Sequence, residues 1–60
     1  MKRLIKLTEL DGTPIRLNPD AIVHVRKVQG GTKIDIMTGG YLLIREEPVD
    51  VDESIKAAGV

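Results

Sequence analysis

Two pairs of glycines, Gly30-Gly31 and Gly39-Gly40, divide the middle of this 60-residue chain into short apolar segments. Glycine adopts a positive φ at low cost, and paired glycines between alternating apolar and polar residues indicate β-hairpins. The pattern therefore predicts three strands, at residues 22–28, 32–37 and 41–45, that are joined by two tight turns.

The flanking segments complete the expected fold. Residues 4–10 and 14–17 predict a first hairpin around Asp11-Gly12-Thr13, and residues 18–21 predict a tight turn with one turn of 3₁₀ helix. Asp50, followed three residues later by Glu53, predicts the start of a C-terminal helix that ends at Gly59. Its buried face would carry Val51, Ile55 and Ala58, which recur at helical spacing.

The expected fold class is mainly β. We expect a single small domain over residues 1–60, with a β body (1–45) followed by an acidic linker and the C-terminal α-helix (46–60). The five strands would form an antiparallel curved sheet or an SH3-like barrel. Such a short chain buries a modest core, and this one has neither cysteine nor Phe nor Trp to strengthen it.

If both glycine pairs are two-residue loops, the register follows by counting. Arg26 then lies opposite Asp35, Val25 opposite Ile36, and Ile36 opposite Leu43. One face would collect the apolar side chains of Val23, Val25, Ile34, Ile36 and Leu43. A three-residue loop in the first hairpin would add Ile5, Leu7, Ile15 and Leu17 to this core.

The opposite face of the predicted sheet is unusually apolar for a surface that faces water. It would carry the side chains of His24, Arg26, Val28, Lys33, Met37, Leu42 and Ile44, with Asp35 beside them. Apolar area of this kind marks an interaction surface. We therefore expect these seven residues to be covered by the C-terminal helix, a second copy of the chain in a homodimer, or another protein.

Little in the sequence supports catalysis or cofactor binding. The chain has no cysteine, one histidine (His24) and one aromatic residue (Tyr41), so we expect no catalytic residues, no metal and no cofactor. The acidic residues from Glu46 to Glu53 lack the spacing of a calcium loop. Neither glycine pair precedes a helix, as a phosphate-binding loop requires. We expect a non-enzymatic protein–protein interaction module.

Charge is unevenly distributed along the chain. Residues 1–45 carry a net charge of +4 and residues 46–60 a net charge of −4, within a total of zero. The polarity suits docking of the acidic helix on its own sheet, association between copies, or an anionic partner. The alternative function is a small RNA- or DNA-binding regulator that contacts phosphates through Lys6, Arg16, Arg26, Lys33 and Arg45. No apolar run approaches membrane-spanning length, so we expect a cytoplasmic protein without membrane insertion.

Several short motifs resemble the FlbD family of small bacterial proteins associated with flagellar gene clusters and swarming motility. They are Ile5-Lys6-Leu7-Thr8, Leu10-Asp11-Gly12, the segment 17–22, the segment 32–36, Gly40-Tyr41 and Arg45-Glu46-Glu47. The sequence departs from the family pattern at Thr38-Gly39-Gly40 and at Glu47-Pro48-Val49. The resemblance implies a motility-associated role in a bacterium or phage, and it implies no catalytic residue.

The chain is also similar in outline to the CsrA-type RNA-binding regulators, which are five-stranded dimers with a terminal helix. Leu7-Thr8 and Arg45-Glu46-Glu47 carry this second resemblance. Glu9 stands where that family has a basic residue, so we rank it below the first.

Overall fold

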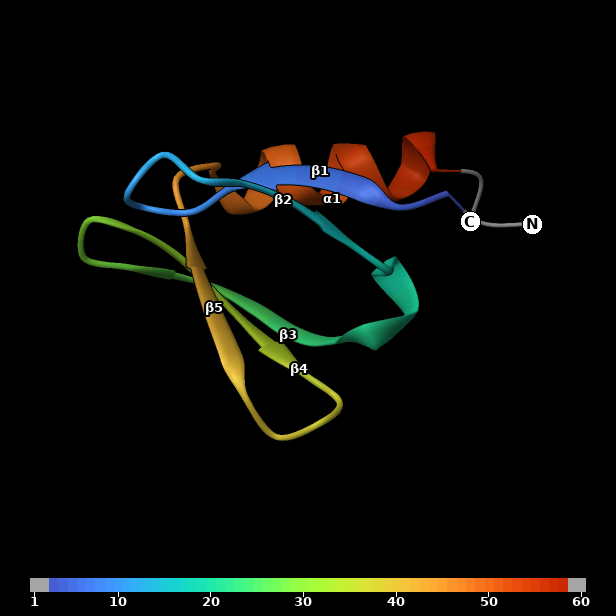
Figure 1. Ribbon diagram of the computed structural model, residues 1–60, viewed down its shortest axis with the longest axis horizontal. Coiled ribbons are helices and arrows are strands. Elements are labelled where there is room, and N and C mark those ends of the chain that lie inside the picture. The colour runs from blue at the N-terminus through green and yellow to red at the C-terminus, as the bar shows by residue number, and fades with distance from the viewer. Residues whose placement is uncertain (1–2, 59–60) are drawn as a thin grey trace.

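The computed structural model describes residues 3–58, which form a two-stranded sheet, a three-stranded sheet and a C-terminal helix (Figure 1). The strands are β1 (Ile5–Thr8), β2 (Pro14–Leu17), β3 (Ile22–Val28), β4 (Gly31–Ile36) and β5 (Tyr41–Ile44). The helices are the 3₁₀ turn η1 (Pro19–Ala21) and α1 (Pro48–Ala57). The mainly β prediction is confirmed, but the strands form two antiparallel sheets rather than a closed barrel.

The β1–β2 and β4–β5 hairpins close with the same three-residue turn, at residues 9–13 and 36–40. In each, the N–H of the first residue donates to the carbonyl of the last, at 2.9 and 3.0 Å respectively. The fourth residue is a glycine with positive φ, which is 97° at Gly12 and 99° at Gly39. This is a tight turn followed by a left-handed residue, which glycine adopts without strain. The first hairpin loop therefore has the expected length of three residues, but it is Leu10-Asp11-Gly12 rather than Asp11-Gly12-Thr13.

The predicted register of β3 and β4 is wrong by two residues. The loop is Gln29-Gly30, so Val28 lies opposite Gly31 rather than opposite Lys33. Because side chains alternate with a period of two, this error leaves every side chain of the paired region on its expected face. Val25 still faces the core, opposite Ile34.

The predicted register of β4 and β5 is wrong by three residues, and this odd error exchanges the two faces of β5. Leu42 lies opposite Ile34 and faces the core, whereas Leu43 lies opposite Lys33 and faces away from it. A bulge in β3 between Ile22 and His24 has a similar local effect. Val23 is 52% exposed instead of buried.

The two sheets meet at the ends of β1 and β5. Glu9 forms an isolated antiparallel bridge with Ile44, and the N–H of Arg45 donates to the carbonyl of Thr8 at 2.8 Å. In Figure 1 the β1–β2 hairpin consequently lies across the three-stranded sheet, with an open angle between β2 and β3. The five strands therefore do not form the single sheet that we expected, and within residues 3–58 the two sheets join at this junction.

Helix α1 begins three residues earlier than the sequence pattern predicts. Glu47 precedes the first turn, and its N–H donates to the carboxylate of Asp50 at 3.4 Å. Pro48 occupies the first helical position, where its missing N–H costs nothing. The predicted end at Gly59 lies outside the described residues, and the last helical residue is Ala57.

The core lies between the β1–β2 hairpin, the three-stranded sheet and α1. Its buried apolar side chains are Ile5, Leu7, Ile34, Ile44, Val51 and Ala58. The partly buried side chains packed against them are Ile15, Leu17, Ile22, Val25, Ile36, Leu42 and Ile55. The predicted apolar face of the helix is therefore confirmed. It packs on the core side of the sheet and leaves the opposite side uncovered.

Candidate interaction surface

The face of the three-stranded sheet that points away from the core is the surface we expected to bind a partner. We call it the outer face. The cross-strand pairs place on it the side chains of His24, Arg26, Val28, Lys33, Asp35, Tyr41 and Leu43. Residues 3–58 contribute no helix or strand that covers this face, because α1 packs with the core residues on the other side.

Charged groups on the outer face are arranged around Asp35. Its Oδ2 atom lies 3.2 Å from Nη2 of Arg26 and 3.8 Å from Nδ1 of His24. The ammonium group of Lys33 lies 4.6 Å from the centre of the Tyr41 ring, which is a cation–π contact. These contacts join five side chains across the three strands, and Asp35 neutralises one of the two cations, Arg26.

Apolar groups on the outer face lie at its β5 edge. Tyr41 is 58% exposed and Leu43 is 38% exposed. Beside them is a shallow hollow of about 370 Å³, to which Leu10 and Asp11 of the first hairpin loop also contribute. An exposed tyrosine on the same face as an arginine is a combination enriched at the centres of protein interfaces.

Four of the seven predicted surface residues lie on the outer face, and three do not. His24, Arg26, Val28 and Lys33 are placed as expected. Leu42 and Ile44 belong to the core, and Ile44 is fully buried, because the three-residue turn at 37–39 exchanged the faces of β5. Met37 is exposed, but it lies in that turn rather than on the sheet.

Tyr41 and Leu43 were missed for the same reason. Counting back from a three-residue loop would have placed both residues opposite Asp35 and Lys33 and thus on the outer face. The sequence signal for this loop length is Gly39, the first glycine of the pair. A three-residue loop of this type ends in a residue with left-handed conformation, which glycine adopts readily.

The cations of the alternative nucleic-acid surface are not brought together. Lys6 and Arg16 lie on the β1–β2 hairpin, whereas Arg26 and Lys33 lie on the outer face of the other sheet. The guanidinium group of Arg45 donates from Nε to the carbonyl of Leu10 at 3.0 Å, which holds the first hairpin loop. The five cations therefore do not form one continuous track for a phosphate backbone.

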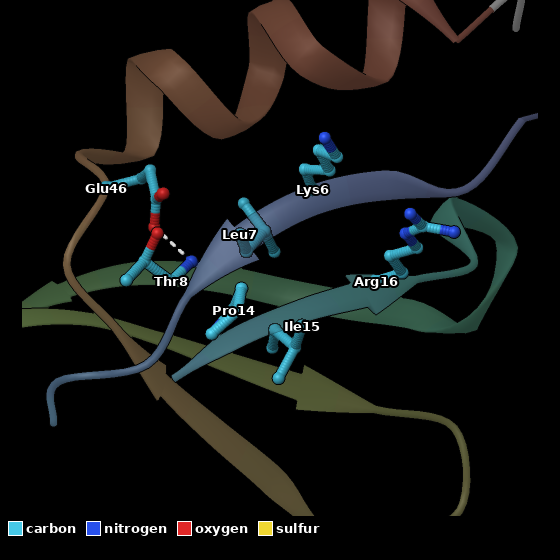
Figure 2. Close-up of a pocket in the computed structure, with 7 residues that line it drawn as sticks. All are labelled: Lys6, Leu7, Thr8, Pro14, Ile15, Arg16 and Glu46. Atoms are coloured by element: carbon cyan, nitrogen blue, oxygen red, sulfur yellow. Dashed lines mark hydrogen bonds between the residues drawn. The ribbon is translucent and has the colours of Figure 1, made fainter. Parts of the chain in front are cut away.

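A second depression, of about 420 Å³, lies on the β1–β2 hairpin (Figure 2). Lys6 and Arg16 border it together with Thr8, Pro14 and Glu46. A carboxylate oxygen of Glu46 accepts a hydrogen bond from the N–H of Thr8 at 2.9 Å, shown as the dashed line in Figure 2. This acidic residue therefore has a fixed position in the depression.

Glu47, which directly precedes α1, also has a structural partner. Both carboxylate oxygens of Glu47 accept hydrogen bonds from the ammonium group of Lys27, at 2.7 and 2.9 Å. Lys27 lies on the core side of the edge strand β3, from where it reaches α1. Within residues 3–58 no group of three His, Asp or Glu side chains is arranged to hold a metal ion.

One carboxyl group has a perturbed acidity. The N–H of Thr13 donates to Oδ1 of Asp11 at 2.9 Å, and this bond is the first cause that lowers the pKa of Asp11. A further hydrogen bond from the Thr13 side chain and the positive charge of Arg45 act in the same direction. The lowered pKa therefore has its cause in the turn of the first hairpin.

The described part of the chain includes no helix that is long and apolar enough to span a bilayer.

Residues 4–58 match the model of the FlbD family, described as flagellar and swarming motility proteins. No significant match was found among curated proteins or among solved structures. The family match covers every strand and the helix.

Proposed function

The chain belongs to the FlbD family of flagellar and swarming motility proteins, and from this premise we propose that it is a non-enzymatic module that binds another protein through its outer face. The observation that carries the proposal is the exposed pair Tyr41 and Leu43 beside two cations on a rigid sheet. Aromatic side chains bury a large area at little entropic cost, and Arg is enriched with them at interface hot spots.

The charges on the outer face indicate the chemistry of the partner. Asp35 neutralises Arg26, whereas Lys33 pairs with no carboxylate of residues 3–58 and lies over the Tyr41 ring. A partner surface that supplies an apolar group to Tyr41 and Leu43, and an acidic group to Lys33, would satisfy all three side chains. The partner is therefore expected to be apolar at its centre and acidic at its rim.

The experiment is complementation of a deletion strain that has lost swarming. The double variant Tyr41→Ser/Leu43→Ser removes the apolar pair without touching the core, and it should fail to restore swarming. Val49→Ser is the matched control, because Val49 is a 62% exposed apolar residue on α1, away from the outer face. Both proteins should show the same thermal unfolding midpoint as the unmodified chain.

A photo-crosslinking residue at position 43 identifies the partner directly, and one at position 49 serves as its control. A discrete crosslinked species from position 43, absent from position 49, supports the proposal. A crosslinked homodimer from position 43, with concentration-dependent sedimentation, would make the partner a second copy of the chain. Full swarming with the double variant would refute a role for this face.

The nucleic-acid alternative makes a different prediction. Binding through phosphates weakens steeply as salt concentration rises, since each contact releases counterions. A mobility-shift assay with RNA and DNA at two salt concentrations distinguishes the two functions. A salt-dependent shift that Arg26→Gln and Lys33→Gln abolish, with Tyr41→Ser neutral, would favour nucleic acid over protein.

A further inference from the structure

Lys6 and Arg16 form a like-charged pair across the β1–β2 hairpin. They are directly opposite each other, and both point away from the core on the same exposed face. Cross-strand pairs in an antiparallel hairpin alternate between hydrogen-bonded and non-hydrogen-bonded pairs. Because Glu9 and Thr13 are a hydrogen-bonded pair, Lys6 and Arg16 are a non-hydrogen-bonded pair, in which the side chains lie closest together. Like charges in this position destabilise a hairpin.

No ion pair within residues 3–58 relieves this repulsion. Neither Lys6 nor Arg16 makes an ion pair or a side-chain hydrogen bond there. Arg26 and Lys33 are also a like-charged cross-strand pair, but both have partners. Arg26 forms an ion pair with Asp35, and Lys33 makes a cation–π contact with the Tyr41 ring. The hairpin pair therefore presents two unpaired cations.

Two hollows border the pair. One is the depression of about 420 Å³ in Figure 2, whose apolar lining includes Pro14 and Ile15. The other, of about 270 Å³, borders Lys6 from the side of α1 and adds the cation of Arg3. An apolar lining beside two cations fits an acidic side chain, which has an apolar stem and a charged end.

We propose that Lys6 and Arg16 bind a side-chain carboxylate of an acidic protein segment that docks in the depression of Figure 2. The site is separate from the outer face, so it goes beyond the proposed function and stands or fails independently of it. With the fixed carboxylate of Glu46, the depression of Figure 2 carries a net charge of +1, which matches one carboxylate. Arginine forms a bidentate pair with such a group.

The test uses a defined probe, the end-blocked peptide Gly-Val-Glu-Val-Glu-Val-Gly, and its counterpart with glutamine at both glutamate positions. Binding is followed by amide chemical shifts of the isotope-labelled full chain. We expect the glutamate peptide to shift the amides of Lys6, Thr8 and Arg16, and the glutamine peptide to bind more weakly. Lys6→Gln and Arg16→Gln should each weaken binding about 3- to 5-fold. The matched control Lys56→Gln, an exposed lysine on α1, should leave it unchanged.

A second readout separates recognition from structure. Because the two cations repel each other, Lys6→Gln and Arg16→Gln should leave the unfolding midpoint unchanged or raise it. A fall in the midpoint would show that the pair stabilises the hairpin and would overturn the proposal. Equal binding of both peptides, or a stronger effect of an RNA homopolymer on the same amides, would also overturn it. Concentration-dependent shifts of these amides without peptide would identify a second copy as the occupant instead.

Discussion

A Cβ atom added to Gly31 would lie 2.5 Å from the carbonyl oxygen of Ile44, and 2.8 Å from a methyl group of Leu10. The first contact is with backbone, which cannot rotate away. Gly31 is therefore required where β4 passes closest to the end of β5 and the first hairpin loop. This role differs from that of Gly30, whose φ is +86° and around which there is open space.

We expect Gly31→Ala to destabilise the fold by about 2–3 kcal/mol, because β4 must move away from β5. Gly40→Ala is the matched control, since its Cβ would meet Ile36 at an ordinary distance of 3.8 Å. Urea unfolding followed by circular dichroism measures both changes. Equal midpoints for the two variants would contradict the close approach seen at Gly31.

A second prediction concerns Gly39, whose φ of +99° lies in the left-handed region. Nothing lies within 4 Å of a Cβ at this position, so the effect of a side chain would be purely conformational. Gly39→Ala should cost about 1–2 kcal/mol, and Gly39→Asn should cost less, because Asn tolerates this conformation. Thermal unfolding of both variants checks this order, and the reverse order would argue against the assigned turn.

Thr32 provides a third prediction, because it is fully buried and its hydroxyl donates to the carbonyl of Glu46 at 2.5 Å. Thr32→Val keeps the shape but leaves that carbonyl without a donor at the junction of β5 and α1. We expect a loss of about 1–3 kcal/mol in unfolding free energy. Thr32→Ser retains the hydroxyl and should keep the junction protected in amide hydrogen exchange, whereas Thr32→Val should not.

The fourth prediction concerns the stability of the fold at low pH. The pKa of Asp11 is lowered below its ordinary value of 3.8, first by the N–H of Thr13, so the folded state favours the carboxylate. Its contribution to stability is fully present above the unfolded-state pKa and is lost as pH falls through the lower, folded-state pKa. Carboxyl chemical shifts measure this pKa directly. Asp11→Asn should remove that part of the acid dependence, since its amide oxygen can still accept from Thr13; an unchanged pH profile would contradict this.

How far the sequence predicts the fold depends on one ambiguity at each glycine pair. Alternation places the five strands and the buried helix positions Val51 and Ala58 correctly. It does not say which glycine of a pair adopts positive φ. In both pairs it is the first, Gly30 and Gly39, while the second is aligned across the hairpin. That single choice sets the loop length and therefore the register.

The consequences of the choice were unequal. Between β3 and β4 the predicted register was wrong by two residues, an even number, so Arg26 and Lys33 were placed on the correct face. Between β4 and β5 it was wrong by three residues, an odd number, so the core residue Leu42 was assigned to the surface and Leu43 to the core. Val23 is exposed because of the bulge in β3, and the alternation of apolar and polar residues in the sequence does not indicate a bulge. The outer face was thus half predictable, with Tyr41 and Leu43 recovered only from the structure.

The bond from Arg45 to Thr8 ties the first strand to a residue made much later during translation. An isolated two-stranded hairpin is marginally stable in water, so β1 and β2 have no lasting partner as they leave the ribosome. Their apolar side chains can be covered only after β5 and α1 have been synthesised. The nascent chain is therefore expected to mature in one late step, and premature termination before Ile44 would leave a product for proteases rather than a partly working domain.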